Sequence, residues 1–339
     1  MDLLPTDDQL AISSTVADLL ANTAPVEKIR HYTPGHGQPP AWASLADLGA
    51  FGLAVAESGG GAGLGPAELM LLFVELGRQL TPGPVLGTVL TAQVAQRSGH
   101  TDLLAGVVAG DLPVALAFPA VGGGAAVKGI PQGEVMVVDA PSARHCLVVT
   151  ETATALVPMA GLDVTESMSP DPCVSVGRAE LDGIAVLLTE SGGATWWLGS
   201  LLVAALQVGI AEATRDRAVA YAKAREQFGQ PIGAFQAVKH RCAEMATRAE
   251  VAHFQTAFAS LVAARDHDEA PLHVASARVL ASEAARANAA DNIVTHGAMG
   301  FSEEIDAHLF ARRAAFLDVL LGTERWYLEA VAAATPSQG

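Results

Sequence analysis

The sequence predicts a mainly α-helical protein with a small β domain between an N-terminal helical domain and a C-terminal four-helix bundle. Hydrophobic residues make up 50% of the 339 residues, and alanine recurs throughout, which favours tightly packed helices over disorder. Short β-rich segments concentrate in the middle of the chain, and long helical periods return from Trp196 onward. We therefore place the three domains at residues 1–111, 112–192 and 193–339.

The N-terminal domain is expected to be helical because its apolar residues recur with helical spacing. Thr6 is a suitable N-cap for a first helix, DDQLAISSTVADLLAN. In PAELMLLFVELGRQL, Leu69, Leu72, Phe73 and Leu76 fall at i, i+3, i+4 and i+7, which places them on one face of a helix. The glycine-rich segment ESGGGAGLGP between these two helices is expected to be a flexible loop.

The middle and C-terminal domains differ in the period of their apolar residues. Strands are expected in PVALAFPA, EVMVVDA, HCLVVTE and GIAVLLTE, which glycine, proline and aspartate clusters separate. The bundle helices are expected over residues 196–227, 235–267, 271–295 and 305–334. Gln230-Pro231, Pro271 and the Gly297 to Gly300 segment separate these helices.

Charge and cysteine content exclude several classes of function. A formal net charge of −16 argues against a nucleic-acid partner, because such proteins carry a basic surface that neutralises phosphates. The three cysteines are widely spaced without a CxxC motif, so neither a disulfide framework nor a metal site is expected, and a reducing cytoplasm fits. The acidic start MDLLPTDDQ does not resemble a signal peptide, and no apolar run reaches the roughly 18 residues of a membrane span.

The segment REQFGQPIGAFQAVKHRCAEMA combines a cation, a tight turn and an aromatic-amide pair. Arg225 near a helix end carries a planar guanidinium that can bind a phosphate through two hydrogen bonds. Phe228-Gly229 turns the chain, and Phe235-Gln236 opens the next helix with a ring and an amide. These groups suit a nucleotide, with charge for a pyrophosphate and ring and amide for an adenosine. In the alternative reading, Arg225 ends a solvated helix, and Phe228 and Phe235 belong to the core between helices.

A second glycine cluster lies in HGAMGFSEEIDAHLFARRAAF, residues 296–316. It ends one long helix at His296-Gly297 and precedes the next, and its glycines permit positive φ or close approach of a ligand to the backbone. A single glycine-rich turn carries little information. Two such motifs on separate helices of one bundle, after an α-then-β domain order, are more specific.

This combination resembles the acyl-CoA dehydrogenase family, flavoenzymes that insert a Cα=Cβ double bond into acyl-CoA thioesters. The similarity covers almost the whole chain, from WASLADLGAFGLAVAESGGGAGLGPAELM through YAKAREQFGQPIGAFQAVKH to HGAMGFSEEIDAHLFARR. In this family the two C-terminal loops reach across a subunit interface to FAD seated mainly in the neighbouring subunit. The resemblance implies that this chain contacts a partner's FAD through Arg225, Gln227, Phe228, Gln236, Gly297 and Gly300.

The sequence departs from the family where the flavin ring and the catalytic base are expected. The family's β domain carries a Thr-Glu-Pro-x-x-Gly-Ser-Asp-like stretch and a Trp-x-Thr/Ser motif; here ALAFPAVGGGAAVKG lacks Ser-Asp, and no tryptophan occurs between Trp42 and Trp196. The family's base is a glutamate at one of two positions, which are occupied here by Leu321 and Gly199. Neither residue can accept a proton.

Nearby acids are weaker candidates for a relocated base. Glu304 and Glu324, like Glu303 and Asp306, are expected to be charges at helix ends or on the surface. His296 and His308 are expected to serve in packing or interface hydrogen bonds rather than catalysis. The sequence therefore predicts no catalytic residue in this chain.

Retained FAD-contacting loops together with a lost flavin site and a lost base suggest a division of labour. The chain resembles the short, base-lacking subunit of actinobacterial heterotetrameric acyl-CoA dehydrogenases that act on steroid side chains. This resemblance implies an α2β2 assembly in the cytoplasm with a paralogous catalytic subunit, which binds most of the FAD and of the acyl-CoA, here a steroid side-chain CoA ester. Two alternatives remain: a self-sufficient dehydrogenase with a relocated base, and a flavin-free protein that binds CoA esters or acts as a scaffold.

Overall fold

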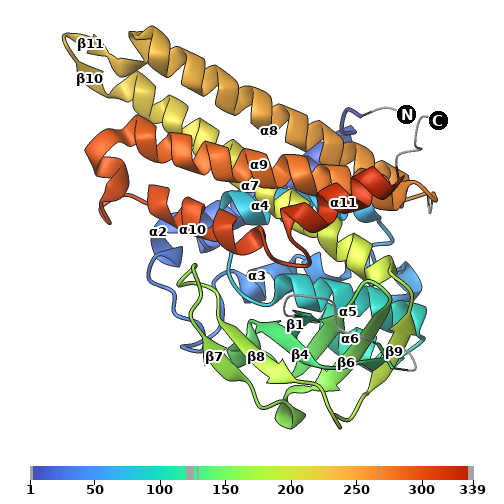
Figure 1. Cartoon of the computed structure of the whole chain (residues 1–339). Helices are drawn as coiled ribbons and strands as arrows, with labels where there is room; N and C mark the ends of the chain where they lie inside the picture. Colours follow the sequence, from blue (N-terminus) through green and yellow to red (C-terminus); the bar gives the residue numbers. More distant parts are fainter. Residues whose placement is uncertain (1–2, 120–125, 128–129, 266, 335–339) are drawn as a thin grey trace.

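A computed structural model describes residues 3–119, 126–127, 130–265 and 267–334 of the chain. Long helices form one side of the molecule, a twisted sheet forms the opposite side, and the N-terminal helices lie between them (Figure 1). This arrangement confirms the predicted mainly helical fold with a separate β domain.

The N-terminal region is helical, as predicted. Its helices are α1 (Asp7–Thr23), α2 (Val26–Ile29), α3 (Trp42–Asp47), α4 (Pro66–Arg78), α5 (Val85–Arg97) and α6 (Thr101–Val108). Thr6 caps α1 in a capping box: its hydroxyl accepts a hydrogen bond from the Gln9 backbone at 3.3 Å, and the Gln9 side chain accepts one from the Thr6 backbone at 3.0 Å. The predicted apolar face of α4 is buried in the main core.

The middle region forms a seven-stranded sheet in the order β7-β8-β4-β1-β5-β6-β9. The strands, including a separate β2-β3 pair, are β1 (Val114–Pro119), β2 (Ala126–Val127), β3 (Ile130–Pro131), β4 (Glu134–Val138), β5 (His145–Val149), β6 (Ala153–Pro158), β7 (Thr165–Ser167), β8 (Val176–Glu180) and β9 (Leu188–Ser191). Alternate residues of β1 face the helices and a smaller core on the outer side, as the period of two requires. The strand predicted in GIAVLLTE is confirmed only in its last residues, since β9 begins at Leu188.

The bundle consists of α7 (Ala194–Ala224), α8 (Gln236–Ala263), α9 (Ala270–His296), α10 (Ala307–Leu317) and α11 (Glu324–Ala334). The first three agree with the predicted helices within a few residues. The expected continuous helix over 305–334 is wrong, because the chain breaks between α10 and α11. Leu321 and Gly322 adopt φ values of 57° and 111° there, which no α-helix accommodates.

Helices α4 and α7 cross at two glycines, and the N-terminal helices pack against the bundle at this crossing. A Cβ added to Gly209 would lie 2.0 Å from the carbonyl oxygen of Val74, and one added to Gly77 would lie 2.1 Å from that of Leu206. Helix α7 is long and apolar enough to cross a membrane, but 78% of its most apolar window is buried within the fold. It therefore has the surroundings of a core helix.

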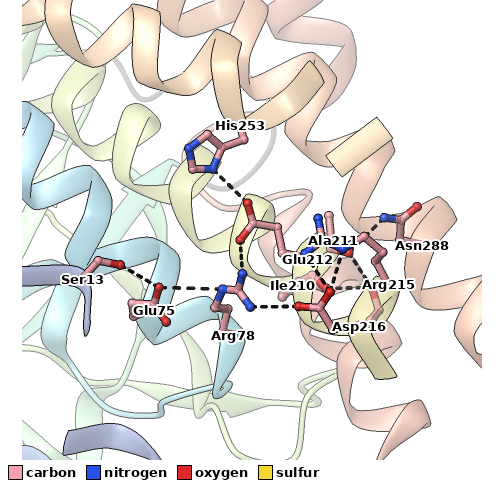
Figure 2. A network of polar contacts seen from close by, with 11 residues as sticks. Ser13, Glu75, Arg78, Ile210, Ala211, Glu212, Arg215, Asp216, His253 and Asn288 are labelled. Carbon is pink, nitrogen blue, oxygen red and sulfur yellow. Dashed lines mark hydrogen bonds and ion pairs between the residues drawn. The ribbon is translucent and has the colours of Figure 1, made fainter. Parts of the chain in front are cut away.

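A polar network beside this crossing joins α1, α4, α7 and α8 (Figure 2). The buried Glu212 carboxylate pairs with Arg78 at 2.6 Å and with the Nδ1 atom of His253 at 2.9 Å. Burial alone would raise the pKa of Glu212, but the His253 hydrogen bond and the Arg78 charge hold it below its ordinary value. Glu75, also beside Arg78, has a raised pKa because burial outweighs that charge. The charged groups of the network are paired with one another, so we assign the network a structural role.

Glu212→Gln is expected to destabilise the chain by about 3 kcal/mol at pH 7, because it removes the carboxylate charge nearest to Arg78 and the one that pairs with His253. Because the pKa of Glu212 is lower in the folded chain than in the unfolded chain, its carboxylate stabilises the fold at pH values above the ordinary pKa of 4.5. This stabilisation is lost as the pH falls through the lower folded-state pKa. The difference between the wild type and the variant should therefore shrink below about pH 4.5. Urea unfolding at pH 7 and at stepwise lower pH measures it, and a difference independent of pH would contradict this role.

Candidate functional site

The Arg225 motif forms a hairpin that projects beyond the end of the bundle, between α7 and α8 (Figure 1). Arg225 ends α7 in an extended conformation, and β10 (Glu226–Gln227) pairs antiparallel with β11 (Gln230–Pro231). Phe228 and Gly229 form the turn with φ values of 53° and 78°. Positive φ at both central residues is typical of the type I′ turns that close two-residue hairpins.

The side chains of this hairpin point into solvent. Phe228 is 92% exposed and meets the ring of Phe235 edge to face at 6.1 Å, so it does not belong to this chain's core as the alternative reading required. A positive φ at an aromatic residue costs conformational energy, which is typical of functional loops. Phe235 precedes α8, and Gln236, its first residue, is exposed together with Arg225 and Gln227. The predicted ring, amides and guanidinium are thus gathered on one exposed end of the bundle.

The glycine loop closes α9 next to this hairpin. The His296 ring lies against the Tyr221 ring at 4.1 Å, so the end of α9 packs on the last turn of α7, just before Arg225. Gly297 has φ 61° and open space around it, whereas a Cβ at the buried Gly300 would lie 2.2 Å from the carbonyl oxygen of Ile293. Gly297 thus leaves its backbone open to a ligand, and Gly300 is required for packing.

Large apolar side chains at or near the two loops are partly or largely exposed in the described part of the chain. They are Phe228 at 92%, Phe301 at 80%, Val294 at 49% and Met299 at 41% exposure. Exposed apolar side chains gathered around functional loops are typical of interaction surfaces.

Both predicted base positions lie together in the core. A Cβ added to Gly199 would lie 2.6 Å from a methyl group of Leu321 and 3.2 Å from one of Leu90. Leu321 and Leu90 are fully buried, so leucine side chains fill the space beside Gly199. No proton acceptor is present at either position.

The loop that carries Leu321 is nevertheless firmly held. The guanidinium of the buried Arg278 donates to the carbonyl oxygens of Leu317 at 3.2 Å and Leu320 at 3.0 Å. The Tyr327 hydroxyl donates to the Leu321 carbonyl oxygen and lies 2.7 Å from the Ser200 hydroxyl. These contacts fix the left-handed conformation of Leu321.

The junction of the three domains encloses a cavity of about 60 Å³ lined by Phe73, Leu116, Val138 and Leu320. Small-molecule pockets usually have roughly 300–1,000 Å³, so this part of the junction has no room for a flavin ring. The glycine stretch in which the sequence lacks Ser-Asp lies largely outside the described residues, at 120–125 and 128–129.

The cavity wall carries a charge cluster that the sequence did not reveal. Arg313 of α10 forms a buried ion pair with Asp171 of the β domain, and Arg313 and Thr81 each keep one buried polar atom without a partner in the described chain. Burial raises the pKa of Asp139, on the same wall, to about 7 despite the nearby Arg313 charge. Arg313 and Asp171 are 142 positions apart in the sequence, so no local signal links them.

The weaker base candidates lie away from Leu321 or are already paired. Glu303 and Glu304 are exposed, and Glu324 pairs with Arg286 at 2.6 Å. Asp306 lies at a helix end, as expected, since it is the N-cap residue of α10, but it is not on the surface: it is 7% exposed and accepts two hydrogen bonds from Arg30. The Nδ1 atom of His308 donates a hydrogen bond to the Ile305 carbonyl oxygen at 3.0 Å. Within the described ranges no cluster of His, Cys, Asp or Glu could hold a metal ion.

Comparisons with known proteins match most of the chain. Residues 6–103 match the acyl-CoA dehydrogenase N-terminal domain, and residues 198–335 match the acyl-CoA dehydrogenase C-terminal domain. Acyl-CoA dehydrogenase FadE34 of Mycobacterium tuberculosis is 38% identical over 95% of this chain, but the match spans only 46% of FadE34. Acyl-CoA dehydrogenase IpdE2 of the same organism is 32% identical over 92% of both chains.

A solved structure with the same fold is a complex of two differently named proteins, ChsE4-ChsE5 from Mycobacterium tuberculosis. The superposition has a TM-score of 0.87 at 26% identity and covers 99% of this chain and 100% of the matched chain.

Proposed function

We propose that this chain, which belongs to the acyl-CoA dehydrogenase family, is the non-catalytic subunit of a heteromeric acyl-CoA dehydrogenase and completes its partner's FAD site. The observation that carries this proposal is the contact between Gly199 and Leu321, which fills both base positions with apolar groups. Removal of the acyl α-proton requires a base, so the partner must supply it. FAD, when bound, would supply the hydride acceptor for this reaction.

The donor set of this chain fits the outer half of FAD rather than its reactive ring. The exposed Arg225 offers a guanidinium for a diphosphate, and the exposed amides of Gln227 and Gln236 suit the adenosine half. The cavity of about 60 Å³ at this chain's own domain junction is too small for the flavin ring. The residues therefore fit a cofactor that is seated mainly in a neighbouring subunit.

A paralogous partner agrees with two comparisons. ChsE4-ChsE5 is a complex of two different proteins, and more than half of FadE34 lies outside the match, which leaves room for a second unit of this size. We propose a steroid side-chain CoA ester as substrate, because the sequence resembles the base-lacking subunits of steroid acyl-CoA dehydrogenases. The domain limits 1–111, 112–192 and 193–339 and a cytoplasmic location belong to this proposal.

Expressed alone, the chain is expected to be flavin-free or poorly soluble, because the apolar groups around its loops lack their cover. Absorbance of bound flavin at roughly 400–500 nm measures the cofactor content, and size-exclusion chromatography measures whether the chain is soluble. A stable, yellow, active homo-oligomer would instead support a self-sufficient dehydrogenase with a relocated base. A soluble chain that binds CoA esters without flavin or partner would support the scaffold alternative.

Co-expression with a paralogous catalytic dehydrogenase is expected to give a heterotetramer with about two FAD molecules rather than four, since each FAD needs one intact flavin site. The ratio is the amount of flavin released by denaturation divided by the amount of complex. The amount of complex is determined from its mass and from amino-acid analysis. Four equivalents after reconstitution would show that this chain's own β domain still binds flavin, and our interpretation of the domain junction would fail.

A further inference from the structure

A pocket of about 600 Å³ lies between α2, α7, α9 and the start of α10. Helix α7 contributes Arg217 and Tyr221 to its lining, and α9 contributes Asn292 and His296. Its volume falls within the roughly 300–1,000 Å³ that is usual for small-molecule sites. The proposed function gives this pocket no role.

The pocket lies on another face of the helices than the proposed FAD contacts. Val294 follows Asn292 by two positions, so at roughly 100° per residue it lies about 200° around α9 from it. Val294 is 49% exposed, whereas Asn292 is fully buried. Among the described residues that line the pocket, none is a proposed FAD contact. The pocket is therefore a separate site on the helices that carry the two loops.

One polar group that lines the pocket is the side-chain amide of Asn292. Neither its Nδ2 nor its Oδ1 atom has a hydrogen-bond partner within the described residues. Buried amides are nearly always hydrogen-bonded, because an unpaired one costs free energy. Asn288, one turn earlier on α9, shows the usual arrangement: its Nδ2 atom donates to the carbonyl oxygens of Ala211 and Met245 at 3.0 and 2.9 Å. Asn292 thus keeps one donor and one acceptor for a ligand.

Two guanidinium groups share one buried carboxylate at the start of α10. Arg30 donates to the Asp306 carboxylate through Nε at 2.9 Å and Nη2 at 2.5 Å, whereas the nearest Arg217 nitrogen is 3.9 Å from it. Asp306 is the N-cap residue of α10, but its side chain makes no capping hydrogen bond. Arg217 lies over the Phe310 ring at 4.9 Å, and the described chain offers its N–H groups no hydrogen-bond acceptor. Arg217 and the N-terminus of α10 therefore both keep donors for an anion.

Two exposed carboxylates, Glu27 and Glu304, also line the pocket and form no ion pair within the described part of the chain. They accept hydrogen bonds and repel negative charge, so they favour a ligand that carries donors as well as an anionic group. A phosphate monoester with hydroxyl groups meets both conditions. Its phosphate suits the guanidinium and the helix N-terminus, and its hydroxyl groups suit the carboxylates.

We propose that this pocket binds a small hydroxylated phosphate monoester, namely a sugar phosphate or a nucleoside monophosphate. The phosphate binds between Arg217 and the start of α10, and the hydroxyl groups donate to Glu27 and Glu304. The Asn292 amide then pairs with a further polar group of the ligand. The site does not depend on the proposed function, since it uses none of the proposed FAD contacts.

Isothermal titration of the purified complex with ribose 5-phosphate and with AMP tests the site. Each ester is expected to bind with a dissociation constant on the order of 10–100 μM. Arg217→Ala should raise this constant at least about ten-fold, and Arg217→Lys should recover part of the affinity because it keeps the charge. Lys223→Ala removes an exposed cation of the same helix that does not line the pocket, and it should leave binding unchanged.

Asn292→Leu distinguishes a ligand contact from a structural one. Because the Asn292 amide makes no hydrogen bond within the described chain, a leucine of similar size should keep or raise the thermal unfolding temperature. The same variant should weaken binding of the esters about ten-fold. A variant that unfolds at a lower temperature and binds normally would show a structural role and contradict the proposal. Tighter binding of AMP than of ribose 5-phosphate would assign the Asn292 amide to the base, and equal binding would assign it to the sugar.

The proposal is overturned if neither ester binds at millimolar concentration, or if Arg217→Ala and Asn292→Leu both bind as the wild type does. Flavin content of each variant complex separates this result from the proposed function. Loss of ester binding with flavin retained is the expected outcome. Loss of flavin together with ester binding would show that the pocket belongs to the FAD contacts and is not a separate site.

Discussion

Replacing Arg225 by alanine in the assembled enzyme is expected to weaken flavin binding about ten- to a hundred-fold. The substitution removes a charge-assisted donor from the cofactor's diphosphate, a loss of roughly 1.5 to 3 kcal/mol. Arg225→Lys should restore little of the flavin affinity, because an ammonium group cannot reproduce the two parallel hydrogen bonds of a guanidinium. Flavin retained after stepwise dilution of the complex measures the effect.

Two kinds of control accompany this variant. Arg325→Ala removes a guanidinium that is 89% exposed on α11 and should leave flavin binding unchanged. Glu304→Gln and Glu324→Gln should leave the dehydrogenation rate largely intact, since the proposed base belongs to the partner. If Arg225→Ala keeps its flavin while either glutamine variant loses turnover with flavin bound, the proposed roles are reversed and this chain carries a base.

Gly209→Ala is expected to destabilise the fold by about 3 kcal/mol or more. The new methyl group would lie 2.0 Å from the Val74 carbonyl oxygen and 2.7 Å from the Arg78 nitrogen, and backbone cannot move aside as a side chain can. The α4–α7 crossing must then open, which also separates Arg78 from Glu212. Urea unfolding of the purified protein measures the change.

Gly161→Ala is the matched control, because its Cβ would lie no closer than 4.0 Å to Ile184 and its backbone is free of positive φ. It should change the free energy of unfolding by less than about 1 kcal/mol. A Gly209→Ala protein as stable as this control would show that α4 and α7 can move apart without a loss of stability. The glycine crossing would then not hold the domains together.

Features with a local signal were predictable from the sequence. Thr6 and Gln9 specify a capping box, and Phe228-Gly229 before Pro231 specifies the hairpin between two long helices. The fold class followed from these periods and from the resemblance to a family. Strands β7 and β8 were not predicted because they are short or carry polar residues at alternate positions, which weakens the apolar period.

Features that depend on tertiary contacts were not predictable. The break between α10 and α11 falls at Leu321, a good helix former that Arg278 and Tyr327 hold in the left-handed region. The Arg313–Asp171 pair joins distant parts of the chain. At the candidate site, the sequence supplied the residue types, whereas the exposure of Phe228 and the contact of Gly199 with Leu321 needed coordinates.

Helix α7 runs from the Leu321 loop at one end to the Arg225 hairpin at the other. Gly199 and Arg225 are 26 positions apart on it, about 39 Å at 1.5 Å per residue, so a cofactor held at one end cannot react at the other. Changes at the Leu321 end therefore leave the groups at the Arg225 end unaltered. The buried loop at one end of this rod and the exposed hairpin at the other can vary independently.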